Sequence, residues 1–180
     1  MALESFSNSL TRAAGIVTSY SGVTIGAGST ELPLSASTGI GVSDLVDNQF
    51  FLAGTKVRQI DGATVYTDTA STNQATTTAQ TVRFLGPTTA YTSPSATKSI
   101  LIGGTFANNT NNSVNLTVEI YDQSTGISAA IASKIPVPSG SSFVVSDIGK
   151  TLLESQDELR IYSDATNAID ANISILTGVN

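Results

Sequence analysis

The sequence predicts an all-β protein: an antiparallel, jelly-roll-like β-sandwich with an N-terminal arm and a small inserted β module. The stretch VNLTVEIYD (114–122) alternates apolar and polar residues with the period of two that a strand requires. The second half of the chain holds roughly five or six predicted strands, this one included, at 8–12-residue spacing with turn residues between them, which is typical of a small sandwich. The 180 residues include 25 Thr and 24 Ser, and the branched Cβ of Thr favours extended backbone.

Residues 1–20 are predicted to form the N-terminal arm. Phe6, Leu10 and Ala13 or Ala14 recur at roughly helical spacing on a serine-rich background, so a short helix is the alternative. The extended arm is preferred because chain ends that must reach a neighbouring molecule often have this composition.

Residues 21–86 are predicted to form the small β module. Its clearest signal is GTKVRQIDGATVYTD, in which Asp61-Gly62 separates two alternating runs. Asp-Gly favours the positive φ values of a tight hairpin turn, so this stretch predicts a hairpin. The apolar residues of the hairpin and of the closing run QTVRFLG are expected to be buried: Val57, Ile60, Val65, Val82, and Phe84 or Leu85.

Residues 87–180 are predicted to form the antiparallel β-sandwich. Each strand should place its apolar residues on one face. These residues are Ile100 and Ile102, then Val114, Leu116, Val118 and Ile120, then Leu159 and Ile161, and finally Ile169, Ala171, Ile173 and Ile175. Pro136 and Pro138 fit an edge strand or a bend, because proline has no N–H to donate to a sheet.

The asparagine-rich stretch FANNTNNSVNL poses a choice between a turn, a binding surface and a glycan acceptor. Residues 108–112 lie between two predicted strands, and Asn tolerates left-handed backbone, so a hairpin loop is predicted. Asn-x-Ser/Thr patterns occur at Asn108, Asn111, Asn115 and Asn172, but the last two fall inside predicted strands. Glycosylation also needs a secretory route, and MALESFSNSLTRAAG lacks the pattern of a secretion signal.

Composition argues against several classes of partner. The net charge is −6, and the eight Lys and Arg residues are spread singly, so no basic patch for nucleic acid is expected. No apolar run is long enough to span a bilayer, so no membrane partner is expected. Cysteine is absent, which removes disulfides and thiol chemistry.

The sequence predicts no catalytic, cofactor-binding or metal-binding residues, and therefore a protein that is not an enzyme. Histidine and cysteine are absent, so no Ser–His or Cys–His pair can form. The glycine-rich runs STGIGVSD and TIGAGST do not complete a phosphate-loop motif. Neither a glycosidase pair nor a calcium site is expected among the acidic residues, because most of them lie at predicted turns: Asp44, Asp47, Asp61, Asp68, Asp157, Glu158, Asp164 and Asp170.

Residues 86–180 resemble a module of tailed-bacteriophage virion proteins. The resemblance lies in the succession TTAYTSP, KSILIGGTFANNT, VNLTVEIYDQSTG, KIPVPSGSSFVV and GKTLLESQDELRIYSDATNAIDANISIL. Within the last run, a Leu-Glu-x-x-Asp-x-Leu-x-Ile pattern starts at Leu153 and ends at Ile161. GTKVRQIDGATVYTD looks like a short β repeat in structural proteins of marine cyanophages, and MALESFSNSLTRAAG is similar to their N-terminal arm.

This resemblance implies a non-enzymatic, homo-oligomeric building block that contacts other virion proteins and is assembled in the host cytoplasm. A tail, neck or baseplate component is the first hypothesis, and a capsid decoration protein is the second. Exposed strand edges with little charge would suit strand addition by neighbouring subunits. A third hypothesis, a carbohydrate-binding or adhesive module, would need exposed aromatic residues, and five tyrosines are available: Tyr20, Tyr66, Tyr91, Tyr121 and Tyr162.

Overall fold

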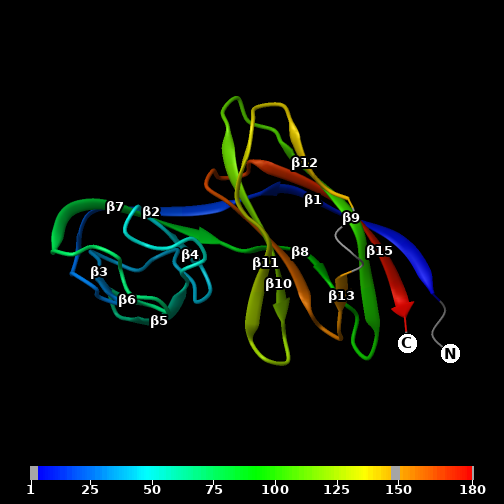
Figure 1. Cartoon of the computed structure of the whole chain (residues 1–180), viewed down its shortest axis with the longest axis horizontal. Helices are drawn as coiled ribbons and strands as arrows, with labels where there is room; N and C mark the ends of the chain where they lie inside the picture. Colours follow the sequence, from blue (N-terminus) through cyan, green and yellow to red (C-terminus); the bar gives the residue numbers. More distant parts are fainter. Residues whose placement is uncertain (1–3, 147–150, 180) are drawn as a thin grey trace. The chain divides into compact units, whose positions relative to one another are not determined.

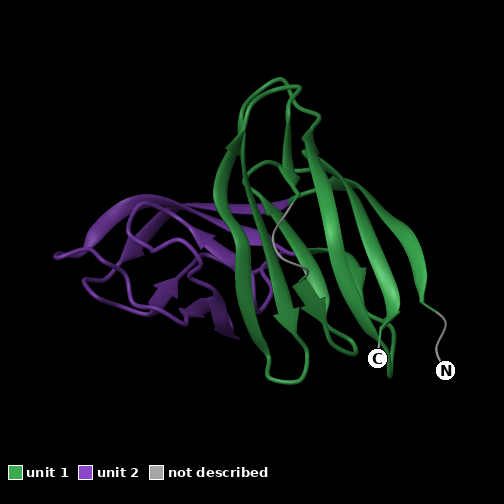
Figure 2. Cartoon of the chain, turned by 45° about the vertical axis from the view of Figure 1, so that its right-hand side comes forward, with its two compact units in different colours: residues 1–15, 88–180 green, residues 16–87 purple. Residues whose placement is uncertain are grey.

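The computed structural model describes residues 4–146 and 151–179, and the regular elements in these ranges are all strands (Figure 1). The prediction of an all-β protein is therefore confirmed. The chain divides into two compact units (Figure 2). Unit 1 comprises Met1–Gly15 and Thr88–Asn180, and unit 2 comprises Ile16–Pro87.

Unit 1 contains two antiparallel sheets. The five-stranded sheet has the order β1-β15-β9-β12, with β13 also paired to β9, and the four-stranded sheet has the order β11-β10-β14-β8. Their strands are β1 (Ser5–Ala14), β8 (Thr88–Thr92), β9 (Lys98–Asn108), β10 (Val114–Asp122), β11 (Ile127–Val137), β12 (Ser142–Val145), β13 (Thr151–Leu153), β14 (Glu158–Ser163) and β15 (Ile169–Val179).

The pairing within unit 1 has the topology of a jelly roll. The first strand β1 pairs with the last strand β15, β8 pairs with β14, β9 pairs with β12 and β13, and β10 pairs with β11. The chain is thus folded back on itself as one long antiparallel ribbon, whose tip is the turn between β10 and β11. Rolling this ribbon gives two facing sheets, which is the jelly-roll arrangement.

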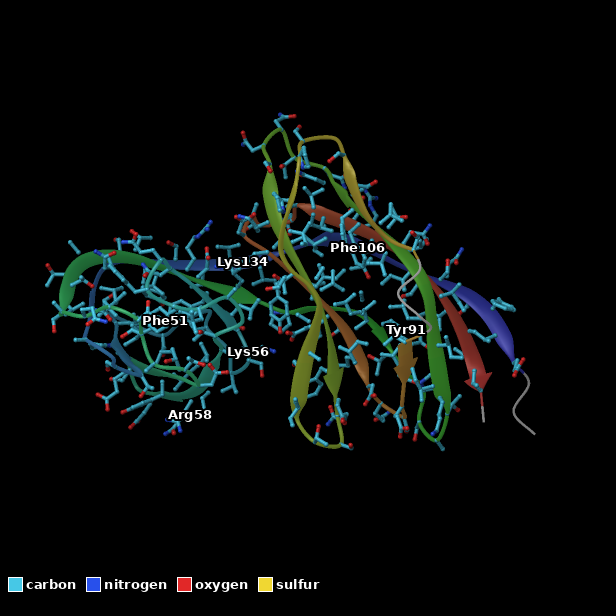
Figure 3. The ribbon with its side chains drawn as sticks, viewed as in Figure 1. Phe51, Lys56, Arg58, Tyr91, Phe106 and Lys134 are labelled. Atoms are coloured by element: carbon cyan, nitrogen blue, oxygen red, sulfur yellow. The ribbon has the colours of Figure 1, made fainter. Side chains whose placement is uncertain are left out.

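The core of unit 1 lies between the two sheets. Strictly alternating runs supply it, because only one face of each strand can be buried against the other sheet. Ile169, Ile173 and Ile175 of β15 are fully buried, as are Leu159 and Ile161 of β14. Phe106 of β9, labelled in Figure 3, belongs to the same core. The buried faces expected for β10, β14 and β15 are confirmed, with Ile120 only half-buried.

The buried face of β9 differs from the expectation. Ile102 is 43% exposed and Ile100 is half-buried, whereas Leu101 and Phe106 are buried. The register explains this: Leu101 lies opposite Ile175, but Gly103 lies opposite Ser174, so Ile102 is an extra residue in β9. A β-bulge of this kind changes which residues of a strand face inward.

Residues 5–14 form strand β1, which corrects the prediction of an arm over residues 1–20. β1 pairs antiparallel with β15 over Ser5–Ala14. A serine-rich run can be extended both as a free arm and as a strand of a sheet. Here it is a strand, because β15 supplies partners for its backbone hydrogen bonds. The next strand, β2 (Ile16–Ile25), already belongs to unit 2.

Unit 2 is a small β module with two three-stranded sheets of its own. One has the order β2-β7-β4 and the other has the order β3-β6-β5. The remaining strands are β3 (Glu31–Pro33), β4 (Leu45–Asp47), β5 (Val57–Asp61), β6 (Thr64–Thr67) and β7 (Thr77–Gly86). Its core includes Phe51, Val65, Val82 and Phe84, which are buried. The unit starts five residues before the predicted module boundary, because Ile16 of β2 already pairs with Gly86 of β7.

The predicted hairpin in unit 2 is confirmed. β5 pairs with β6, and Asp61 lies opposite Thr64. Gly62 has a φ of 58°, but Asp61 still belongs to β5, so the two-residue loop is Gly62-Ala63 instead of Asp61-Gly62. The expected burial of Val57, Val65, Val82, Phe84 and Leu85 is confirmed, whereas Ile60 is half-buried.

The asparagine-rich stretch is a loop between β9 and β10, as predicted. Asn108 is 2% exposed, and its side-chain amide donates hydrogen bonds to the carbonyls of Asn112 and Val137 at 2.7 and 2.9 Å. Its Oδ1 accepts hydrogen bonds from the N–H and the hydroxyl of Thr110, both at 2.8 Å. The side chain of Asn108 thus satisfies the backbone of the turn, as buried polar groups require.

Candidate functional site

The outward-facing side of the five-stranded sheet is the candidate binding surface of unit 1. Ile169, Ala171 and Ile173 of β15 are buried, so the alternate residues of β15 point away from the core. Residues that lie opposite each other in a sheet share a face, which extends this outward face over the neighbouring strands. Its large apolar members are Phe6, Leu10, Ile100, Val144, Leu152 and Leu176, and we call this set the outer face.

The outer face is apolar and open to solvent. Phe6 is 77% exposed and Leu10 is 73% exposed, while Val144 and Leu152 are about half exposed. Single exposed apolar residues are ordinary, but several on one side of one sheet mark a surface suited to a partner.

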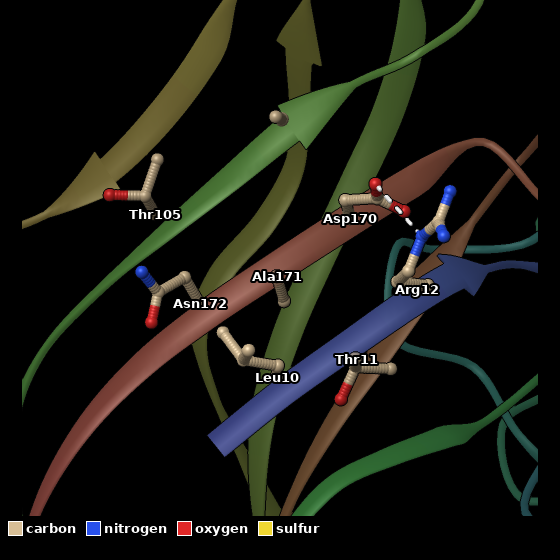
Figure 4. Close-up of a pocket in the computed structure, with 8 residues that line it drawn as sticks. Leu10, Thr11, Arg12, Thr105, Asp170, Ala171 and Asn172 are labelled. Atoms are coloured by element: carbon tan, nitrogen blue, oxygen red, sulfur yellow. Dashed lines mark ion pairs between the residues drawn. The ribbon is translucent and has the colours of Figure 1, made fainter. Parts of the chain in front are cut away.

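Two hollows lie on this face beside β1. One, of about 260 Å³, is shown in Figure 4 and is bordered by Leu10, Thr105 and Asn172, with the ion pair of Arg12 and Asp170 at its end. The other, of about 310 Å³, is lined by Phe6, Ser7, Asn8 and Ser174. Apolar and hydrogen-bonding groups alternate along β1. The hollows are therefore better suited to contact the side chains of another protein than to catalyse a reaction.

β1 is also an edge of the five-stranded sheet. Over Ser5–Thr11 it pairs on one side with β15, and it ends the strand order among the described residues. At Ala13, which has a φ of 55°, a β-bulge ends the regular ladder. The N–H of Ala13 donates to Asp170 Oδ1 at 2.8 Å, which holds this bulge. The regular part of the edge, Ser5–Thr11, has the geometry for further strand pairing.

A second cluster is buried on the four-stranded sheet. Tyr162 is fully buried and donates a hydrogen bond of 2.6 Å to Oε1 of Glu119, which is 3% exposed. Burial raises the pKa of the Tyr162 hydroxyl far above its usual value of 10, and the nearby charge of Glu119 adds to this. Tyr162 therefore stays protonated and acts as a hydrogen-bond donor, and it is no base or nucleophile.

Arg160 lies in the same sheet as this cluster. Its Nε donates to Oε2 of Glu158 at 2.8 Å, and its guanidinium lies 3.6 Å from the ring centre of Tyr121. The charged ends of Arg160 and Glu158 thus contact each other, and a cation–π contact covers one ring face of Tyr121.

Most of the acidic residues considered as possible sites have structural partners. The carboxylate of Asp44 accepts a hydrogen bond from the Gly41 N–H at 2.8 Å. Burial raises the pKa of Asp44 above its usual value of 3.8, and that hydrogen bond opposes the shift only in part. Further partners are Arg83 for Asp47, the N–H of Lys56 for Asp68, the N–H groups of Gln123 and Glu154 for Asp157, and Asn115 for Asp164. In residues 4–146 and 151–179, no three acidic residues gather as metal ligands would.

The tyrosines do not assemble an exposed aromatic groove in either unit. Tyr162 is buried, and Tyr121 lies under Arg160. Tyr91, labelled in Figure 3, shares a hydrogen bond of 2.9 Å with the Ser99 hydroxyl. In unit 2, Tyr20 donates to the carbonyl of Thr38 and Tyr66 is half-buried.

The outer face was not found from the sequence, although its signal is present. Phe6 and Leu10 are four residues apart, which fits both a helix and one side of a strand, since four is also a multiple of two. The spacing therefore gave no decision between helix and extended chain. That β1 pairs with β15 depends on contacts more than 150 residues apart, for which no local signal exists.

Comparison of the chain with protein families, with curated proteins and with solved structures found no match. None of the described residues forms a helix long and apolar enough to cross a lipid bilayer.

Proposed function

We propose that the chain is a structural subunit of a tailed-bacteriophage virion, in the tail, neck or baseplate, and that it works by contacts between copies and with other virion proteins. In this proposal it is not an enzyme. The capsid surface is the alternative position, because a decoration protein would use the same kind of contact.

The outer face is the observation that supports this function best. Phe6 and Leu10 on this face are more than 70% exposed. When another subunit covers them, apolar area is removed from water, which makes the contact favourable in free energy. In a symmetric particle the same contact recurs around the assembly, so that modest interfaces sum to a stable one.

The jelly-roll topology is compatible with this function but does not select it. Jelly rolls occur in capsid proteins, and also in lectins and cupins, so the fold alone leaves the function open. The phage context comes from the resemblance of residues 86–180 and of GTKVRQIDGATVYTD to virion proteins.

An adhesive, carbohydrate-binding role is less well supported. Sugar rings stack on exposed aromatic side chains, but Tyr121 and Tyr162 are covered by other groups of unit 1. The exposed aromatic side chain of the outer face is Phe6, which lacks the hydroxyl that a sugar site commonly uses.

Labelling of purified virions tests this proposal. An antibody against the chain, or a tag placed at the exposed β10–β11 turn (residues 123–126), is expected to mark one position on the particle in electron micrographs. Label at the tail, neck or baseplate supports the first position, and label spread over the shell supports decoration. Purified particles that lack the chain by mass spectrometry would contradict the proposal.

A further inference from the structure

We propose that β1 pairs antiparallel with β1 of a second copy of this chain, about a twofold axis at Asn8, so that two five-stranded sheets join edge to edge. This deepens the proposed function by naming one contact between copies. The contact involves β1 and the preceding Glu4, and it can be tested without virions.

β1 offers a strand edge for further pairing. β1 pairs with β15 on one side only, and its regular part runs from Ser5 to Thr11. Edge strands present N–H and C=O groups that another strand can pair with. Such edges are commonly blocked by a bulge, a proline or an inward-pointing charge, but here the bulge lies beyond this part, at residues 12–13.

Twofold symmetry restricts the registers in which two copies of β1 can pair. In an antiparallel pair, opposed residues share a face of the sheet. A twofold axis perpendicular to the sheet therefore passes midway between one residue and the same residue of the copy, which lie opposite each other. With the axis at Asn8, Phe6 lies opposite Leu10 of the copy. One residue beyond each end of the regular part, the same register brings Glu4 toward Arg12 of the copy, and each pairing occurs twice.

The side chains that this register brings together are complementary. The side chains of Phe6, Asn8 and Leu10 lie on the outer side of β1, and Phe6 and Leu10 are largely exposed. Glu4, just before β1, is exposed, and Arg12, in the bulge, has a side chain 90% exposed beside the outward-facing Asp170. The register joins apolar to apolar and negative to positive. Cross-strand pairs of both kinds stabilise antiparallel sheets.

Neighbouring registers are less favourable. With the axis at Ser7, Glu4 would face Leu10, and Phe6 would face Asn8. With the axis at Ser9, Phe6 would face Arg12, and Asn8 would face Leu10. Each of these places apolar side chains against charged or amide groups, whereas the register centred on Asn8 does not.

The groups near the axis also fit. Oδ1 of Asn8 accepts a hydrogen bond from the Ser174 hydroxyl at 3.2 Å, and its NH₂ group can donate to the Asn8 of the copy. On the opposite side of β1 the register brings together Ser5 with Thr11 and Ser7 with Ser9, which are small enough to avoid a clash. The Arg12–Asp170 pair is long, at 3.8 Å from Nε to Oδ2, and solvent-exposed, so Arg12 remains able to contact Glu4 of the copy.

Single cysteines test the register, because the chain has no cysteine of its own. Across the axis, the Cβ atoms of two copies of residue 8 would lie about 4.5–5.5 Å apart, a small adjustment from the separation that a disulfide needs. Asn8→Cys is therefore expected to form a disulfide-linked dimer on mild oxidation. Leu10→Cys is the matched control on the same face, because its two copies would lie roughly 14 Å apart along the strands.

Mixing variants sharpens this test. Phe6→Cys and Leu10→Cys are each expected to stay unlinked alone, but to form a mixed disulfide dimer when combined, because these residues lie opposite each other. Gln123→Cys, in the exposed β10–β11 turn, measures linkage by random collision. Circular dichroism of each reduced variant shows whether the fold is retained.

Charge reversal tests the same register without cysteine. Glu4→Arg would place Arg against Arg12 twice, and Arg12→Glu would place Glu against Glu4 twice, so each variant alone is expected to dimerise at least about tenfold more weakly. A mixture of the two variants restores both opposite-charge pairs and is expected to form a mixed dimer. Analytical ultracentrifugation measures the dissociation constants, and added salt should reduce the differences.

The outcomes separate this inference from the proposed function. A chain that remains monomeric at high concentration, an oligomer in which Asn8→Cys links no faster than Gln123→Cys, or charge variants that do not recover on mixing would each overturn it. Virions that contain a chain failing these tests would leave the proposed function standing. A chain that dimerises through β1 but is absent from virions would leave the inference standing and remove the function.

Discussion

Each of the two units of this chain is stabilised internally in a different way. Unit 1 is built from long strands, and its buried groups are chiefly the apolar faces of those strands between two sheets. Unit 2 has several strands of three to five residues joined by irregular segments. In unit 2, side chains bridge the irregular backbone: the Ser71 hydroxyl donates to the Gly26 carbonyl at 2.9 Å, and Asn73 donates to the carbonyls of Ile25 and Ala75.

This difference shows two solutions to the same requirement, that every buried backbone group must have a hydrogen-bond partner. A ladder of strands meets it without side chains, so that the side chains of unit 1 are available for the core and for the outer face. Loops meet it partly by backbone turns and partly with Ser, Thr, Asn or Asp side chains at defined positions. Substitutions in apolar positions should therefore affect unit 1 most. Substitutions of small polar residues should matter where the backbone is irregular, which is in much of unit 2 and in loops of unit 1 such as the one that Asn108 holds.

The largest effect is expected for Ile173→Ala in unit 1. Ile173 is fully buried in β15, between β1 and β9, so its truncation should lower the free energy of unfolding by about 2–5 kcal/mol. Chemical denaturation measures the change, and hydrogen exchange shows where it falls. Ile127→Ala in β11 is the matched control, because Ile127 is 65% exposed.

Hydrogen exchange also checks the separation of the two cores. The buried clusters of the two units share no residue, so exchange in Ile16–Pro87 should stay unchanged in Ile173→Ala. Equal acceleration in both units would contradict the comparison.

The next effect is expected for Asn73→Ala in unit 2. Asn73 is 8% exposed, and its removal would leave the carbonyls of Ile25 and Ala75 without this donor, at a cost of about 1–3 kcal/mol. Gln74→Ala, at the exposed neighbouring position, should change stability by no more than about 0.5 kcal/mol. If both variants unfold alike, the side chain of Asn73 is not what holds this loop.

The same contrast explains how much the sequence could predict. The strands β10, β14 and β15 follow from alternation alone, because each buries one face against a sheet. The inward face of β9 was assigned wrongly, because the bulge at Ile102 shifts the alternation and leaves no mark in composition. Asn73 gave no signal at all, since its role depends on carbonyls that the fold brings near.

The candidate site was harder to predict than the fold. Phe6 and Leu10 were visible as apolar residues in a polar run, but the sequence could not show that β1 pairs with β15 and exposes both. Which side of a terminal segment faces solvent is set by long-range pairing. The chemistry of the outer face therefore becomes readable only once the register is known.

A smaller, pH-dependent effect is expected for Asp44→Asn in unit 2. Burial raises the pKa of Asp44 in the folded chain above its usual 3.8, so the protonated form contributes stability below about pH 3.8. That contribution is lost as the pH rises through the folded pKa, because the buried carboxylate then ionises. Asparagine keeps an acceptor for the Gly41 N–H and does not ionise.

Asp44→Asn should therefore gain stability relative to the unmodified chain as the pH rises through the folded-state pKa of Asp44 toward 7. Thermal unfolding at a series of pH values measures this. Asp61→Asn, at the exposed end of β5, controls for loss of one negative charge. A difference between variant and unmodified chain that is flat with pH would rule out ionisation of Asp44 as its cause.

The smallest effect on folding is expected for Arg12→Ala in unit 1. Its side chain is 90% exposed and its contact with Asp170 is 3.8 Å long, so the free energy of unfolding should change by less than about 0.5 kcal/mol. Arg83→Ala in unit 2 should cost more, because Arg83 contacts Asp47, whose side chain is only 16% exposed. Denaturation of both variants in low and high salt measures the contrast. An Arg12 that proves as costly to remove as Arg83 would mean that the outer edge of β1 stabilises unit 1 itself, and it would then be less free to serve a second copy.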